Sequence, residues 1–79
     1  MTTSAARNAA KRLETAIRRI GEAETANGHA QFIDATEADK HAARADVWRE
    51  KSWEAAAVLD AEVGAGGWVW TRFNTVAFH

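Results

Sequence analysis

Apolar residues recur at helical spacing over the first third of the chain. The pattern predicts a helix over residues 4–26, with Thr3 or Ser4 as its N-cap and Asn27-Gly28 as its stop. At about 100° per residue, one face of this helix carries a stripe of apolar positions. The stripe consists of Ala6, Ala9, Ala10, Leu13, Ile17, Ile20 and Ala23.

A second helix is predicted over residues 36–63, a stretch that contains neither Gly nor Pro. Thr36 or Asp34 can cap its start. Small side chains recur there at intervals of three and four, close to a heptad pattern that only Arg49 interrupts. This seam consists of Ala35, Ala38, Ala42, Ala45, Ser52, Ala56, Leu59 and Val63. Alanines let two helix backbones approach closely but bury little apolar area, so the seam stabilises the pair only weakly.

The segments outside the two helices are apolar as well. The connection, residues 27–35, contains Phe32 and Ile33, which we expect to tuck under the helices or to form a very short strand. Residues 64–67 (Gly-Ala-Gly-Gly) are expected to end the second helix and to form a hinge.

The last segment, residues 68–79, is rich in aromatic and β-branched residues and is predicted to be extended. A lone strand cannot satisfy its own backbone groups. This tail is therefore expected to pair with residues 29–35, with a second copy or with a partner, or to lie across the helices.

Together these patterns predict a mainly α single domain over residues 1–79. It is a long antiparallel helical hairpin, followed by a Gly hinge and a short extended or β C-terminal segment. The composition shows a weakness of this fold, because 19 of the 79 residues are Ala and large apolar residues are few. A small domain without Cys has no disulfide to compensate, so it depends on its tail, on a second copy or on a partner.

The tail holds much of the large apolar surface of the chain in a few residues, and the candidate partner-binding residues there are Trp68, Trp70, Phe73, Val76 and Phe78. Trp is enriched at the energetic centres of interfaces, so the tail could insert these residues into a partner. Alternatively the tail folds back and covers the alanine seam, and the two interpretations are compatible.

Trp48 and Trp53 are two further candidate partner-binding residues. They point about 140° apart on the second helix, so one neighbouring helix cannot cover both. The spacing predicts that the second helix is contacted on two sides, by the first helix and by the tail or a second subunit. A homodimer through the second helix or the tail is one form of this prediction.

The charges are divided unevenly between the helices. The first helix carries a basic face that could bind nucleic acid, formed by Arg7, Lys11, Arg12, Arg18 and Arg19. The chain as a whole has a net charge of −1, no Gly or aromatic residue interleaves the basic run, and no helix-turn-helix spacing is present. We therefore expect no nucleic-acid partner, and interpret the basic face as a solvated one that pairs with the acidic second helix.

The sequence contains no set of residues typical of catalysis. His29, His41 and His79 are scattered, and Asp34, Glu37 and His41 are too loose a group to predict a metal site. There is no Cys nucleophile and no phosphate-binding loop. We expect no enzymatic activity, no cofactor and no metal.

No apolar run is long enough to span a bilayer, and the N-terminus lacks the apolar core of a secretory signal, so we expect a cytoplasmic protein without a membrane partner. In its small size, single domain and aromatic-rich end, the chain resembles small accessory proteins of phages and mobile elements, including anti-CRISPR proteins. That resemblance implies an inhibitor of a larger host protein. The leading hypothesis is a non-enzymatic protein-binding module that acts by steric blockade, and the alternative is a small nucleic-acid-associated protein that uses the basic face of the first helix.

Overall fold

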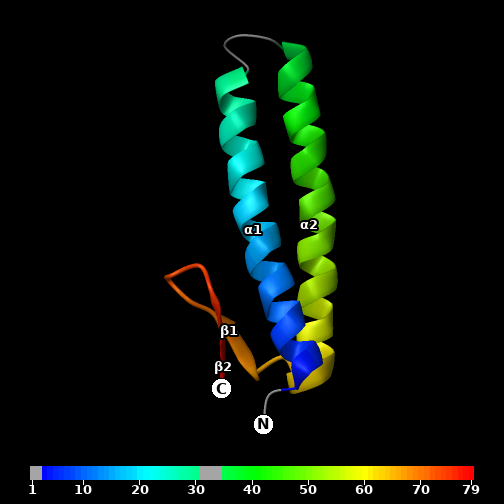
Figure 1. Ribbon diagram of the computed structural model, residues 1–79, viewed down its shortest axis with the longest axis vertical. Helices are drawn as coiled ribbons and strands as arrows, with labels where there is room; N and C mark the ends of the chain where they lie inside the picture. Colours follow the sequence, from blue (N-terminus) through cyan, green and yellow to red (C-terminus); the bar gives the residue numbers. More distant parts are fainter. Residues whose placement is uncertain (1–2, 31–34) are drawn as a thin grey trace.

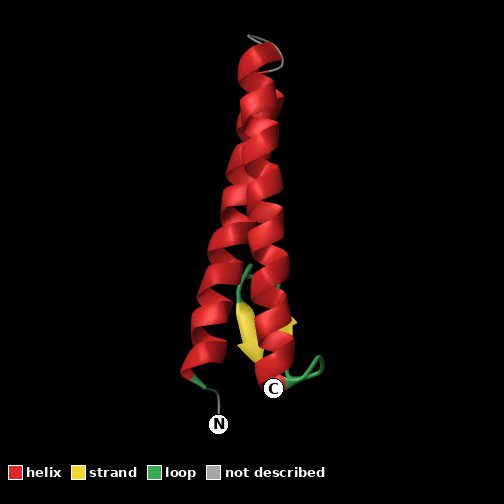
Figure 2. Cartoon of the chain, turned by 90° about the vertical axis from the view of Figure 1, so that its right-hand side faces the viewer, coloured by secondary structure: helices red, strands yellow, loops and turns green. Residues whose placement is uncertain are grey.

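Two long helices lie side by side and antiparallel, and a small sheet follows them (Figure 1). The computed structural model describes residues 3–30 and 35–79. α1 spans Ser4–Ala30 and α2 spans Ala35–Val63. β1 (Trp68–Trp70) and β2 (Val76–Phe78) form a two-stranded antiparallel sheet, which confirms the predicted fold class. The molecule is elongated, at 49 × 21 × 17 Å, and the sheet lies near the end of the hairpin where both termini are found (Figures 1 and 2).

Thr3 caps the start of α1, as one of the two predicted alternatives. Its hydroxyl oxygen accepts a hydrogen bond of 3.0 Å from the backbone N–H of Ala6. The same Oγ1 donates to Glu62 Oε2 at 3.2 Å, which ties the start of α1 to the end of α2. The cap thus also joins the two helices at the end where the tail is placed.

Replacing Thr3 by Ala is expected to lower the free energy of unfolding by about 1 kcal/mol, because the N–H of Ala6 loses its acceptor. Urea denaturation followed by circular dichroism measures this loss. Ser4→Ala is the matched control, since Ser4 is already helical and exposed, and we expect it to change stability by less than about 0.5 kcal/mol. Equal effects of the two substitutions would show that Thr3 is not the cap.

The predicted stop of the first helix at Asn27-Gly28 is wrong, because α1 continues to Ala30. Asn and Gly tolerate the left-handed conformation that ends helices, but they do not enforce it, and neither residue has a positive φ here. α2 begins at Ala35, so Thr36 lies inside the helix, and the predicted connection over residues 27–35 is shorter at both ends. Asp34 and the apolar pair Phe32 and Ile33 lie outside the described residues.

The predicted end of the second helix is confirmed. Gly64 has a φ of 82°, the left-handed conformation that glycine adopts without strain, and its N–H donates to the Asp60 carbonyl at 2.9 Å. Gly67 lies so close to the helix end that a Cβ atom there would collide with the Val63 carbonyl. These glycines turn the chain back toward the helices and fix where the tail begins.

Alanines make up most of the interface between α1 and α2. The buried residues are Ala6, Ala9, Ala10, Leu13, Ala16 and Ala23 in α1, and Ala38, Ala45, Ser52, Ala55 and Leu59 in α2. Ile17 and Ala42, predicted to be in the seams, are exposed, whereas Ala16 and Ala55 take buried places. Helices that approach closely through alanine bury only a narrow strip, so residues at the edge of a stripe are left outside it.

Arg49, the residue that interrupts the seam of α2, reaches across to α1. Its guanidinium pairs with Glu24 of α1 and, at 2.8 Å, with Asp46 of its own helix. Ser52 lies one turn further on, and its hydroxyl donates to the Arg49 carbonyl at 2.6 Å. The interruption in the apolar pattern is therefore an ion-pair contact between the helices.

The tail pairs with itself. β1 and β2 are in register with Trp68 opposite Phe78 and Trp70 opposite Val76, a pairing within the tail that is not among the expected alternatives. The expected placement of the tail against the helices agrees with the packing of its strands on α1 and α2. Asn74 adopts a φ of 60°, and this left-handed residue lets the chain reverse between Thr71 and Thr75. The N–H of Thr71 donates to the Thr75 carbonyl at 2.9 Å and closes the turn.

Candidate functional site

The base of the tail hairpin is packed against the helices. Paired residues of two strands share a face of the sheet, so Trp68, Trp70, Val76 and Phe78 lie on the same face. Three of these, all but Trp70, pack against a core cluster of α1 and α2. That cluster consists of Ala6, Ala9, Ala10, Leu13, Ala55 and Leu59. These predicted partner-binding residues thus contribute bulk to the alanine seam.

Two hydrogen bonds hold the base of the hairpin to both helices. Trp68 Nε1 donates to Asp60 Oδ1 of α2 at 2.8 Å. The backbone N–H of Val76 donates to Glu14 Oε1 of α1 at 3.1 Å. The Val76 N–H points outward from the edge of the sheet, so the Glu14 carboxylate satisfies a donor that the strand pairing leaves free.

The tip of the hairpin, residues 71–75, stands away from α1 (Figure 1). Phe73 is 72% exposed, the largest exposed fraction among the large apolar side chains of the described residues. The Arg72 guanidinium lies 5.0 Å from the centre of the Phe73 ring, a cation–π contact. Trp70, at 36% exposed, lies at the boundary between the packed base and this tip.

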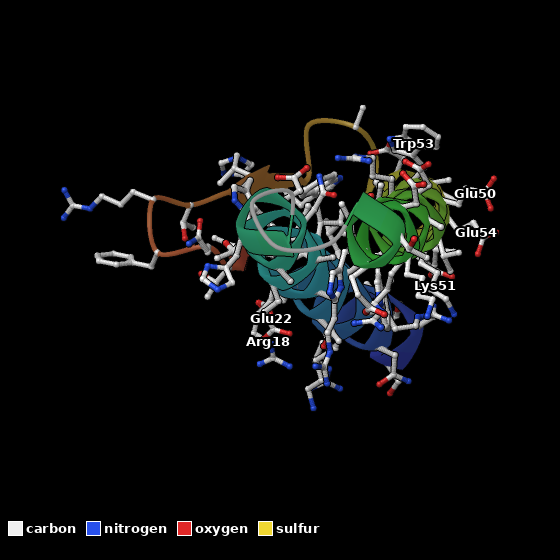
Figure 3. All side chains as sticks on the ribbon, turned by 90° about the horizontal axis from the view of Figure 1, so that it is seen from above. Arg18, Glu22, Glu50, Lys51, Trp53 and Glu54 are labelled. Atoms are coloured by element: carbon white, nitrogen blue, oxygen red, sulfur yellow. The ribbon has the colours of Figure 1, made fainter. Side chains whose placement is uncertain are left out.

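α1 and β1 both contact α2, but the expectation that a second contact covers Trp53 as α1 covers Trp48 is not met within the described chain. Trp48 is half-buried and lines a groove beside α1, but Trp53 is 68% exposed. Figure 3 shows Trp53 and Lys51 pointing to opposite sides of α2, with Glu50 and Glu54 between them. Neither α1 nor the tail covers Trp53.

The basic face of α1 is not brought together at one place. Lys11 and Arg12 line the groove that holds Trp48, Arg18 lines a cleft beneath the hairpin tip, and Arg7 lies on neither. Arg19 pairs with Glu22 of its own helix at 3.1 Å.

The expected pairing of the basic first helix with the acidic second helix is wrong. The one ion pair between α1 and α2 in the described chain joins Arg49 of α2 to Glu24 of α1. The ion pair between the helices therefore has its cation on α2 and its carboxylate on α1, the reverse of the prediction, and no α1 cation pairs with α2 among the described residues.

The described residues contain no group of three His, Cys, Asp or Glu side chains that could hold a metal ion. His29 and His79 are exposed, and His41 is half-buried with an Nδ1 atom that has no hydrogen-bond partner. None of the helices described is long and apolar enough to cross a bilayer.

Comparison with protein-family models, with curated proteins and with solved structures found no match. Two surfaces of the described chain are candidate functional sites: the hairpin tip, and the groove between α1 and α2 that contains Trp48.

Proposed function

We propose that this protein is a binding module that docks on a larger protein through its hairpin tip and blocks that protein sterically. The observation that carries the proposal is the contrast between the two ends of the tail hairpin. Its base packs against the helices, whereas its tip leaves Phe73 72% exposed. A chain with so few large apolar residues gains nothing for its own fold from a phenylalanine in that position.

A fixed base makes the tip a better ligand. Trp68 is bonded to Asp60 and the Val76 N–H to Glu14, so the two strands are anchored to both helices. The turn is closed by the hydrogen bond between Thr71 and Thr75. A loop that is already ordered loses little conformational entropy when it binds, so more of the contact free energy appears as affinity.

The chemistry of the tip indicates what its partner offers. Phe73 fits an apolar pocket, and the Arg72 guanidinium beside it favours acidic side chains at the rim. A cleft of about 780 Å³ lies between the tip and α1, with Ile17 and Glu14 on its wall, and leaves room for the rim of such a pocket. More specifically, the larger protein would be a host protein that docking of the tip inhibits, as small phage accessory proteins do.

Replacing Phe73 by Ala is expected to weaken partner binding about 30-fold or more, the loss typical of an aromatic residue at the centre of an interface. The measurement compares wild-type and variant proteins as immobilised baits in a lysate of the source organism, with quantitative mass spectrometry, followed by titration of the purified partner. Thermal unfolding should be unchanged, because the ring contributes little to the core.

The matched control is Trp53→Ala. It removes an aromatic side chain of similar exposure, 68%, that lies on α2 and away from the tip. We expect this variant to retain the partner. A protein retained equally by wild type and by Phe73→Ala, or lost equally from Trp53→Ala, would contradict docking through the tip.

A further inference from the structure

A groove with basic walls runs between α1 and α2 and contains no residue of the tail. Its floor is formed by Thr15, Trp48, Ala55 and Val58, and its volume is about 570 Å³. Small side chains on the floor leave the groove open, since Thr15 and Ala55 do not fill the space beside the Trp48 ring. Lys11 and Arg12 of α1 stand on one wall and Lys51 of α2 on the other.

The groove continues along the helices toward Ala26. A second hollow shares Thr15 and Trp48 with the first, and is lined further on by Arg19 and Arg44. Fifteen residues separate Lys11 from Ala26, so at 1.5 Å per residue the two hollows extend over about 22 Å of α1. That length matches about four turns of an added helix.

The walls of this groove are far more basic than the chain as a whole, which has a net charge of −1. Five cations lie along the two hollows, Lys11, Arg12, Arg19, Arg44 and Lys51, against the two carboxylates of Glu22 and Glu54. Among the described residues only Arg19 of the five has an ion-pair partner. Such an excess of positive charge around an apolar floor attracts a ligand that is both acidic and partly apolar.

We propose that this groove binds an acidic amphipathic helix of a partner protein, which packs on α1 and α2 as a third helix. Its apolar face contacts Trp48, Ala55 and Val58, and carboxylates at its flanks pair with the cations of the two walls. This site is distinct from the hairpin tip. It adds a second contact and does not depend on the first.

Two other occupants fit the groove less well. A nucleic-acid base would need the open face of the Trp48 ring, but the Lys51 ammonium lies 5.3 Å from the ring centre, and Glu54 would repel the phosphates. If a second copy of the chain bound through the same groove, its five groove cations would face the five of the first copy and repel them. An acidic helix instead satisfies both the charge and the apolar floor.

The test uses an 18-residue fluorescein-labelled peptide of Leu and Glu, patterned as an amphipathic helix, with the full-length protein and fluorescence anisotropy. The matched probes are the same peptide with Lys in place of Glu, and a 15-nucleotide oligothymidylate. We expect the Glu peptide to bind at least about tenfold more tightly than either probe, and to shift the Trp48 indole N–H resonance.

The double variant Arg12→Glu with Lys51→Glu should weaken binding of the Glu peptide about tenfold or more and improve that of the Lys peptide. Arg7→Glu with Lys40→Glu makes the same change of charge outside the groove and outside the hairpin tip, and should alter binding less than about twofold. The thermal transition shows that each variant is folded, since all four side chains are exposed.

Several results would overturn the proposal. These are no binding of the Glu peptide, equal weakening by the two double variants, or a Trp48 resonance that does not move. Tighter binding of the oligonucleotide would assign the groove to nucleic acid. A dimer in sedimentation that dissociates on the groove substitutions alone would assign it to a second copy.

Discussion

Replacing Leu59 by Ala lowers the free energy of unfolding by about 2–5 kcal/mol, the largest loss that we expect from a single substitution. Leu59 is the one large side chain of the described residues that is fully buried, at 0% exposed. It belongs to the same cluster as Leu13 and Ala55, against which Trp68 and Phe78 pack. Alanine neighbours cannot extend into the space that the substitution leaves, so the cavity stays open.

Urea denaturation of the Leu59→Ala variant, followed by circular dichroism, measures this loss. The control is Ile17→Ala, which truncates a side chain that sequence periodicity also assigns to the core but that is 37% exposed. We expect the control to lose less than about 1.5 kcal/mol, in proportion to its partial burial. If the two variants lost equal stability, the core would not be centred on Leu59.

Ending the chain at Gly67 is expected to abolish cooperative unfolding at room temperature. The deletion removes Trp68, Val76 and Phe78 from the core cluster, together with the hydrogen bonds to Asp60 and Glu14. A fully buried large apolar side chain contributes about 1.5–3 kcal/mol, so three partly buried ones contribute about 3 kcal/mol in total. The core of a domain this small seldom supplies more than about 3–5 kcal/mol, so the two helices alone have almost no stability left.

Thermal unfolding at 222 nm, with the near-ultraviolet signal of Trp48 and Trp53, distinguishes the outcomes for the truncated chain. The expected result is a broad, non-cooperative loss of helix and a weak near-ultraviolet signal. A full-length Phe73→Ala variant serves as control, because it changes only the exposed tip and should melt as the wild type does. A truncated chain with an unchanged cooperative transition would show that the tail contributes nothing to the stability of the helices.

The sequence alone predicts much of this fold, and the successful predictions concern local features. Helical periodicity identifies α1 and α2, and the cap at Thr3 and the helix end at Gly64 follow from residues whose preferences depend on their nearest neighbours. The end of α1 is less determined by local sequence than the end of α2, because α1 continues past Gly28.

The features that sequence reasoning missed depend on contacts between distant residues. Val76 bonds Glu14, 62 positions away, and no pattern within either helix indicates that partner. The strand pairing has a weak local signal, since Asn74 lies between Thr71 and Thr75, where a tight turn can form. The groove could not be seen from α1 alone, because Trp48 and Lys51 come from the other helix.

The base of the tail hairpin belongs to the folded core, whereas its tip stays exposed. Native-state hydrogen exchange at the Val76 amide tests whether the base stays docked, because that N–H is bonded to Glu14 only in the docked hairpin. We expect Val76 to exchange as slowly as the amide of Leu59 in α2, through unfolding of the whole protein. Exchange of Val76 that is faster by orders of magnitude, with Leu59 still protected, would show that the tail undocks on its own and is not part of the core.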